Sequence, residues 1–518
     1  MRNTVTRLRR GPDLEMALLL AGAALVRFWA LSAESLWFDE SYSVWVARHS
    51  VGWHISLSTQ RIFPPLYYLC LHFWLALGES EFIVRSLSAG IGLVSVVVIY
   101  LLGRQLFDKR VGFLSALLLA VSPLHIWYSQ EARMYILVAG LGLCSAYFMW
   151  LALREGRGWH WLAYVVSTAL LMNAHYFAVF LVPFQNAFVL YWLLWGQARK
   201  GLLWQWCLGQ VVVGLLSVVG LAGILSAESS YWWGLLDTWH GAPGIADLLG
   251  LMFSFSLGNT VQGGWVYWGG MLLFGSCILW GLFAVGRRWL EKRGQIASGH
   301  NGPNVDAQGR WQEVDGLVFT VLYLLVPLGL VFVLSQFQSF WVLRYIFPFL
   351  PPYCILLGLG ISKLPRRMDV VFASLIVLLS LWPLANIYRY EQKENWRDSV
   401  RYIEMQEQVG DLILLVDEDI WLPFEHYYRG SARRVGISRG IKDRELIAAR
   451  IAMLLPGHDR VWLVLSHTDN WGVRDYLRAS EYAEVVSEAE YTGIGVHLFA
   501  VSLGDTSERG LGVPAPGS

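Results

Sequence analysis

Residues 112–140, GFLSALLLAVSPLHIWYSQEARMYILVAG, contain two apolar runs that are joined by a turn with ionisable side chains. A helix that crosses a membrane needs about 20 mostly apolar residues. The runs near 112–127 and 134–153 suit a compact pair of such helices. The turn between them carries His125, Glu131 and Arg133. Ionisable residues next to hydrocarbon are costly, so this turn is by default a candidate functional site.

The composition predicts a polytopic membrane protein. Of the 518 residues, 55% are hydrophobic and only 15% are charged, whereas about a quarter of the residues are charged in a soluble globular chain. The 27 tryptophans and 23 tyrosines suit the two interfaces of a bilayer, where an aromatic ring meets both oil and water. The formal net charge of +1 gives no reason to expect a nucleic acid partner.

Apolar runs of suitable length recur along the first 387 residues. By the length rule we count about eleven candidate spans, near 14–33, 84–103, 112–127, 134–153, 161–173, 177–195, 203–225, 263–286, 316–335, 346–362 and 370–387. Lysine and arginine are concentrated in alternate loops, which the positive-inside rule places in the cytoplasm. The N-terminus is then cytoplasmic in the plasma (inner) membrane. The first outward loop, 34–83, and the chain after residue 387 are extracytoplasmic.

The sequence changes character after residue 387. DLILLV, RVWLVLS and GVHLFAVSL are typical of buried strands, and DRELIAARIAMLL and WGVRDYLRASEYAEVV are typical of amphipathic helices. Alternating strands and helices predict a small α/β domain with a mainly parallel sheet. The expected fold class is an all-α polytopic membrane domain (1–387), followed by an extracytoplasmic α/β domain (388–505) and a disordered tail (506–518).

Ionisable side chains from distant parts of the sequence share the outward end of the predicted bundle. They are Asp39 and Glu40 after the first span, His125, Glu131 and Arg133 in the second outward turn, His175, and Arg344 before the tenth span. A carboxylate can take a proton from an attacking hydroxyl, and arginines can hold a phosphate. With an apolar bundle for a lipid tail, this set suits transfer from a lipid-linked phosphate donor to a hydroxyl outside the cell.

The order of the motifs resembles that of bacterial glycosyltransferase family 39. The motifs are FDES, PPLYYLCLHFW, EFIVRSLSA, SPLHIWYSQEARMY, NAHYFAVF, RYIFPFLPP and KENWRDSVRYI, and the resemblance covers residues 14–405. Members are membrane glycosyltransferases of the GT-C fold, related to protein O-mannosyltransferases and aminoarabinose transferases. The resemblance implies that a polyprenyl-phosphate sugar donates a monosaccharide, with inversion, to a glycan, lipid or protein of the cell envelope.

The resemblance also implies roles for the acidic motifs. Asp39 matches the family's catalytic acid in the first outward loop and is the expected general base. Its neighbour Glu40 would orient the base or touch an ion. Glu131 matches the acid of the second outward loop, which would bind the acceptor or support Asp39. Arg133 in the same motif could reach the donor phosphate, although it could also form a simple interfacial ion pair with Glu131.

Further binding residues follow from the later motifs and from the first outward loop. Arg344 and Tyr345 match the RY before the late span, near the place where a lipid phosphate would dock. Tyr68 belongs to the PPLYY of the first outward loop. Many family members have a His or Asp before the two prolines, where this chain has Phe63. Arg61 is the residue that could supply the missing polar group.

Several of these residues also have structural interpretations. Asp39 could cap a helix at the interface by accepting bonds from its free N–H groups. Arg344 could extend along apolar surface to place its charge in the interface. His125 and His175 are candidates for substrate binding, but a lone histidine in an aromatic turn is often a hydrogen-bonded structural residue.

A metal requirement is not implied by the expected chemistry. A pair of carboxylates such as Asp39 and Glu40 can bind a divalent cation, yet a general base and a phosphate leaving group need no metal or other cofactor. Asp417 and Asp419 form an acidic D-x-D after a predicted strand, as in the metal sites of nucleotide-sugar transferases. We interpret this stretch as an exposed loop, because nucleotide sugars are absent outside the cell.

Two other functions fit part of the pattern. A transporter or flippase for lipid-linked sugars would also need ionisable groups in a membrane bundle, but transporters place them near the midplane between repeated halves. Here the acids lie at one face, and the sequence has no evident repeat. A transferase of whole oligosaccharides would use similar chemistry, and the sequence does not separate it from a transferase of single sugars.

Overall fold

The computed structural model describes residues 14–60, 64–195, 199–223, 241–261, 264–297, 307–338, 340–416, 420–437, 444–466 and 472–502. The chain divides into two compact units. The helical unit contains Met1–Leu31 and Val46–Tyr390, and the sheet unit contains Ser32–Trp45 and Glu391–Ser518. The chain passes from the sheet unit into the helical unit within one helix, α2 (Phe38–Ala47).

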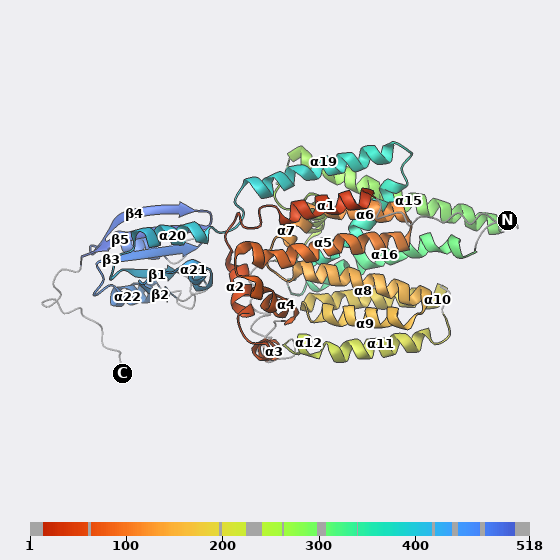
Figure 1. Cartoon of the computed structure of the whole chain (residues 1–518). Coiled ribbons are helices and arrows are strands. Elements are labelled where there is room, and N and C mark those ends of the chain that lie inside the picture. Colours follow the sequence, from red (N-terminus) through yellow and green to blue (C-terminus); the bar gives the residue numbers. More distant parts are fainter. Residues whose placement is uncertain are drawn as a thin grey trace, which may run out of the picture. The chain divides into compact units, whose positions relative to one another are not determined.

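The helical unit is a bundle of long helices that run side by side, with the shorter helices α3 and α4 at one end (Figure 1). Its helices are α1 (Leu14–Phe28), α3 (Val51–Gln60), α4 (Leu66–Trp74), η1 (Leu75–Leu77), α5 (Glu81–Leu106), α6 (Lys109–Val121), α7 (Pro123–Ser129), α8 (Tyr135–Glu155), α9 (Gly158–Met172), η2 (Tyr176–Phe180), α10 (Leu181–Trp195), α11 (Leu202–Leu216), α12 (Val218–Ala222), α14 (Ile245–Leu257), α15 (Gly264–Ala297), α16 (Ala307–Leu334), α17 (Leu343–Ile346), η4 (Phe347–Phe349), α18 (Leu350–Ser362) and α19 (Met368–Arg389).

The structure confirms a polytopic membrane architecture but not the expected number of spans. Within the described residues, seven helices are long and apolar enough to cross a membrane, or eight if α6 and α7 are one bent span. The predicted spans near 14–33, 161–173 and 203–225 correspond to α1, α9 and α11, each of 15 residues. Apolar runs extend beyond these helices because turns and short helices at the bundle ends are apolar too.

Small residues allow the helices to approach closely. A Cβ atom on Gly103 of α5 would lie 3.0 Å from the Cα atom of Gly112 on α6. A Cβ atom on Gly360 of α18 would lie 1.9 Å from the carbonyl oxygen of Cys277 on α15. Glycine at such contacts lets two backbones meet where lipid offers no hydrophobic driving force between helices.

The sheet unit contains a five-stranded sheet in the order β2-β1-β3-β5-β4. Its elements are α20 (Trp396–Gln406), β1 (Leu412–Val416), α21 (Trp421–Tyr427), β2 (Arg433–Ile437), α22 (Arg444–Leu454), β3 (Arg460–Ser466), α23 (Val473–Ala479), β4 (Ala483–Tyr491) and β5 (Ile494–Val501). Strand β1 pairs in parallel with β2 and with β3. Strand β5 pairs antiparallel with β3 and with β4.

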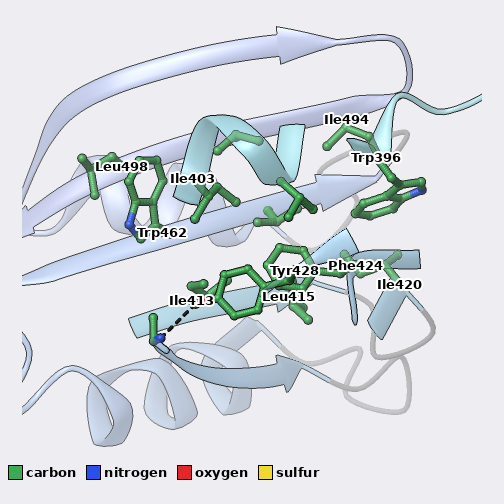
Figure 2. Close-up of a cluster of buried hydrophobic side chains, with 14 residues drawn as sticks. Trp396, Ile403, Ile413, Leu415, Ile420, Phe424, Tyr428, Trp462, Ile494 and Leu498 are labelled. Atoms are coloured by element: carbon green, nitrogen blue, oxygen red, sulfur yellow. Dashed lines mark hydrogen bonds between the residues drawn. The ribbon is translucent and has the colours of Figure 1, made fainter. Parts of the chain in front are cut away.

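Both faces of the sheet are covered by helices. Ile413 and Leu415 of β1 lie in one apolar cluster with residues of α20 and α21. Figure 2 shows Trp396, Ile403 and Phe424 of those helices in this cluster, together with Trp462 of β3. Leu412 and Leu414 lie in a second cluster with residues of α22 and α23. Strand β1 is therefore buried on both faces, which explains its continuous apolar sequence.

The sheet differs from the expected one in its second half. The stretch at 471–486 was expected to be helical throughout, but only α23 is helical and β4 begins at Ala483. Strand β4 is an edge strand with few buried residues, so its sequence is polar and lacks a strand-like apolar pattern. Because β4 and β5 form a hairpin, the sheet is half antiparallel rather than mainly parallel.

The boundaries of the units also differ from the expected domains. Ser32–Trp45, which was expected to contain the end of the first span (14–33) and the start of the first outward loop (34–83), belongs to the sheet unit. The predicted strands DLILLV, RVWLVLS and GVHLFAVSL correspond to β1, β3 and β5. The amphipathic stretch KENWRDSVRYI contains the start of α20, whose buried residues face the sheet. The predicted tail, 506–518, lies outside the described residues.

Glu407 joins the end of α20 to the beginning of β2. It accepts hydrogen bonds from the Tyr428 hydroxyl at 2.6 Å and from the backbone N–H groups of Ser431 and Ala432 at 2.8 and 2.9 Å. Burial acts to raise the pKa of Glu407, but these hydrogen bonds outweigh it and lower the pKa below its ordinary value of 4.5. The folded unit therefore favours the ionised carboxylate.

We expect the substitution Glu407→Gln to lower the free energy of unfolding of the sheet unit at pH 7 by about 1–2 kcal/mol, because three charge-assisted hydrogen bonds weaken in a half-exposed place. The stabilisation by the carboxylate is present above its unfolded pKa and is lost as the pH falls through the lower folded pKa. The difference between the variant and the wild type should therefore disappear at acid pH. Amide hydrogen exchange of β1 and β3 in the detergent-solubilised chain measures the loss in free energy of unfolding. The matched control is Glu481→Gln, since Glu481 is exposed.

Candidate functional site

Ionisable and aromatic side chains gather in the helical unit from three separate parts of the chain. One part is the turn between α7 and α8, which carries Glu131 and Arg133. The second is His175 at the start of η2, and the third is α17, which carries Arg344 and Tyr345. We describe each in turn before asking what the group can do.

The turn between α7 and α8 is fixed by its local sequence. Ser122 caps α7 by accepting a hydrogen bond from the backbone N–H of His125, and Pro123 occupies the first turn of that helix, where its missing N–H has no cost. After α7, the N–H of Arg133 donates to the carbonyl of Glu131 at 2.8 Å. The side chain of Glu131 is buried. The result is a tight turn that carries a carboxylate and a guanidinium two residues apart.

Arg133 contacts helix α4. Its Nη1 donates to the hydroxyl of Tyr68 at 3.4 Å, and Tyr68 is buried on α4. The guanidinium lies over the ring of Tyr135, 5.8 Å from its centroid. The structure thus brings Tyr68 and Arg133, two of the predicted site residues, into contact.

His175 is buried among tyrosine rings. Its Nδ1 accepts a hydrogen bond from the backbone N–H of Phe177, so the histidine caps η2. Its ring centroid lies 5.9 Å from that of Tyr135 and 5.3 Å from that of Tyr345, and the ring stacks on Tyr176 at 4.4 Å. His175 therefore connects the α7–α8 turn to α17.

Arg133 and Arg344 both lie beside the aromatic layer formed by Tyr135, His175, Tyr176 and Tyr345. Both arginines interact electrostatically with His175, although they are far apart in the sequence. Arg344 also lies over the ring of Tyr345, 5.5 Å from its centroid. Two guanidinium groups from different elements, held by aromatic rings, form a place where an anion can be bound bidentately.

A carboxylate accompanies the two arginines. Glu131 and Arg344 both interact electrostatically with Tyr128, whose ring lies 5.5 Å from that of Tyr135. The predicted residues Tyr68, Glu131, Arg133, His175, Arg344 and Tyr345 are thus neighbours in one aromatic layer of the helical unit. Such a layer can bind an anionic group and offer a carboxylate to a second substrate.

His125 belongs to a different group of contacts. It is fully buried, and its Nδ1 lies 2.8 Å from Nη2 of Arg27. A guanidinium can only donate, so Nδ1 is the acceptor and the ring proton is on Nε2. The structure therefore gives this predicted site residue a structural partner on α1.

Arg27 supports the bend between α6 and α7. The two helices meet at 63°, and a helix that ends inside a bundle leaves carbonyl groups without intrahelical partners. Arg27 is fully buried and donates to the carbonyls of Leu119 and Ala120, at 3.1 and 3.0 Å, in the last turn of α6. The arginine thus supplies the donors that the bend requires.

The acidic pair lies in the sheet unit, in the first turn of α2. Glu40 is fully buried and its Oε1 lies 3.2 Å from Nζ of Lys393, which is 9% exposed. Asp39 is half-buried, and its carbonyl accepts a hydrogen bond from the Ser43 hydroxyl at 3.0 Å. The sequence analysis paired Asp39 with Glu40, and the structure adds a buried lysine to the pair.

Some candidates cannot be placed. Arg61, Phe63 and the acidic stretch at 417–419 lie outside the described residues. Among the residues that the structure does describe, no group of three or more His, Cys, Asp or Glu side chains could hold a metal ion.

The sequence analysis missed two buried cations. Arg27 interrupts the apolar run of the first helix, and an arginine at membrane depth is a signal in itself. Lys393 is the first residue of the motif KENWRDSVRYI, which entered the sequence analysis only as part of the family resemblance. Neither partner could be found from sequence, since Arg27 and His125, like Lys393 and Glu40, are far apart along the chain.

The fold as a whole is that of the GT-C glycosyltransferases. The family model for Dolichyl-phosphate-mannose-protein mannosyltransferase matches residues 63–223. A search of curated protein sequences gives no match.

Two solved proteins are similar to the chain over most of its length. ArnT from Cupriavidus metallidurans in the apo state is 15% identical with a TM-score of 0.61, and the alignment covers 93% of this chain and 97% of that one. ArnT bound to undecaprenyl phosphate is 16% identical with a TM-score of 0.57. The oligosaccharyltransferase of Archaeoglobus fulgidus is 14% identical with a TM-score of 0.52, covering 92% of this chain and 72% of that one.

We expect Arg27→Met to destabilise the helical unit by about 2–4 kcal/mol, because the carbonyl groups at the end of α6 would lose their donors away from water. Thermal denaturation in detergent, followed by the loss of the monodisperse protein peak, measures the change. Arg366→Met, on the exposed turn before α19, is the matched control. Equal midpoints for the two variants would show that the bend does not depend on Arg27.

Proposed function

We propose that this protein is an integral membrane glycosyltransferase that moves a monosaccharide from a polyprenyl-phosphate donor to a hydroxyl of an extracytoplasmic glycan, lipid or protein. The GT-C fold supports the class of reaction. Similar proteins have been solved with undecaprenyl phosphate, in ArnT, and with a dolichol-phosphate, in the archaeal oligosaccharyltransferase. The proposal places the enzyme in the plasma (inner) membrane, with its N-terminus in the cytoplasm and its sheet unit outside.

The placement of Arg133 and Arg344 beside the tyrosines that pack on His175 is the observation that carries the proposal. Each guanidinium lies over a tyrosine ring, and the charges of both reach His175. A lipid phosphate needs positive charge at the edge of an apolar bundle, because its tail is in hydrocarbon and its head is an anion. When the sugar is transferred, the phosphate gains negative charge. The two arginines would stabilise this charge.

In the proposed reaction Asp39 is the general base. The acceptor oxygen attacks the anomeric carbon of the donor sugar while Asp39 takes the hydroxyl proton. The bond from the anomeric carbon to the phosphate oxygen breaks, and the electron pair leaves with the polyprenyl phosphate. One displacement inverts the anomeric centre. Glu131 would bind the acceptor, and the reaction needs no metal ion.

We expect Arg133→Gln and Arg344→Gln each to weaken the binding of undecaprenyl phosphate by about 10- to 150-fold, because each loses a charge-assisted contact of roughly 1.5–3 kcal/mol. The lysine variants should bind with intermediate affinity, since an ammonium keeps the charge but not the bidentate geometry. Titration of the purified protein in detergent, followed by native mass spectrometry, measures the affinity. Arg366→Gln is the control, and wild-type affinity in the double variant would contradict the site.

We expect Asp39→Asn to reduce kcat for sugar transfer by about 10²–10⁴-fold, the usual contribution of a general base, with little change in donor affinity. Proteoliposomes would receive labelled polyprenyl-phosphate sugars and crude envelope acceptor. The control is Asp475→Asn, whose side chain is 76% exposed on α23. Full transfer by Asp39→Asn would return this residue to the role of a helix cap. Sugar lipid that crosses the bilayer without transfer would favour the flippase.

A further inference from the structure

The residues just before α2 are hydrogen-bonded to other residues of the sheet unit. Ser35 is buried, and its hydroxyl donates to the carbonyl of Glu394 at 2.7 Å while it accepts from the N–H of Trp396 at 3.0 Å. The N–H of Leu36, also buried, donates to the Tyr427 hydroxyl of α21 at 2.6 Å. A segment of only a few residues is thus hydrogen-bonded to two separate parts of the C-terminal chain.

The same segment has further bonds to residues just before and in α20. The N–H of Gln392 donates to Oε1 of Glu34 at 2.5 Å. The guanidinium of Arg397 donates to the carbonyls of Ser32 and Ala33, at 3.1 and 2.8 Å. Residues 391–397 therefore bind the backbone and side chains of 32–36 at several successive positions, and we call this part of the chain the 391–397 segment.

The buried pair Lys393–Glu40 extends these contacts into α2. Glu40 follows Asp39 directly in the first turn of the helix, and its Oε1 lies 3.2 Å from Nζ of Lys393. Breaking a buried pair is costly because the remaining charge has no compensation. The pair therefore ties the first turn of α2, which also carries Asp39, to the residues before α20.

The 391–397 segment has its own support in the sheet unit. Trp396 is fully buried in the apolar cluster with Ile420 and Phe424, as Figure 2 shows. Its N–H group at Nε1 donates to a carboxylate oxygen of Glu394. The lysine is therefore three residues from a rigid anchor, and its position relative to the sheet is set by packing.

From these contacts we propose that Lys393 is a positioning residue for the acidic pair, acting through Glu40. In this role Glu40 anchors the helix and Asp39 alone takes the proton. The inference rests on the proposed function of Asp39. It assigns the sheet unit a task, which is to hold the base, and it predicts that α2 loses its alignment when the ion pair is removed.

The test compares variants of the full-length protein in proteoliposomes. Lys393→Met removes the charge and keeps the stem, and we expect kcat for sugar transfer to fall at least about tenfold while KM for the lipid donor changes less than about twofold, because the base is displaced but the donor site is not. Lys393→Arg should retain activity within about threefold of the wild type, since it keeps the charge. Glu40→Gln combined with Lys393→Met should be no worse than the more severe single variant, because the two residues act as one unit.

A matched control is available elsewhere in the chain. Lys363, with a side chain that is 11% exposed, forms an ion pair with Glu313 in the helical unit. Lys363→Met removes a similar charge from a similarly buried place without touching α2. Its kcat should equal that of the wild type, which separates loss of alignment from a general effect of removing a buried lysine.

A second readout does not depend on activity. Hydrogen exchange of the peptide that covers 32–45 should become faster in Lys393→Met, and also in Tyr427→Phe, which removes only the hydroxyl bonded to Leu36. Unchanged exchange together with unchanged kcat in Lys393→Met would overturn the proposal, and so would a rise in KM with constant kcat. If the wild type transfers no sugar but exchange responds as expected, the glycosyltransferase function has failed while the alignment of α2 has not.

Discussion

Buried polar groups in an apolar bundle need hydrogen-bond partners within the protein, because hydrocarbon offers none. This constraint is most severe where α6 ends and turns through 63° into α7. Arg27 meets it by donating to the carbonyls of Leu119 and Ala120 and to Nδ1 of His125. The turn that carries Glu131 and Arg133 begins one residue after α7 ends. Its position therefore depends on a residue of α1 that takes no part in the proposed chemistry.

The same need for a partner applies to the acidic pair, Asp39 and Glu40. Glu40 has no exposed surface, and the energetic cost of burying its charge is offset by Lys393. Asp39 is half-buried, which suits the proposed role of a base that meets a substrate. Two neighbouring carboxylates thus have different environments, and a difference of this kind is what separates an anchoring acid from a reactive one.

The sequence predicted the architecture more completely than it predicted the contacts between side chains. Charges inside or beside apolar runs identified Glu131, Arg133 and Arg344, because such residues are rare at membrane depth. Apolar runs identified β1, β3 and β5, which are buried on the sheet. Strand β4 was missed because an edge strand buries few residues and needs no apolar pattern. The pairing of Glu40 with Lys393 leaves no trace in either local sequence, since it depends on how distant parts of the chain fold together.

The tyrosines around His175 show how a membrane protein can hold arginines ready for an anion. A guanidinium that is held by a carboxylate has its charge cancelled, whereas one that lies over an aromatic ring keeps it. Arg133 and Arg344 lie over Tyr135 and Tyr345, so part of their binding comes from contacts that leave their charge in place. Rings also exclude water, which strengthens the field that an arriving phosphate meets. An aromatic layer would thus serve the proposed polyprenyl-phosphate site in two ways, by positioning the cations and by keeping the surroundings apolar enough for their charge to act.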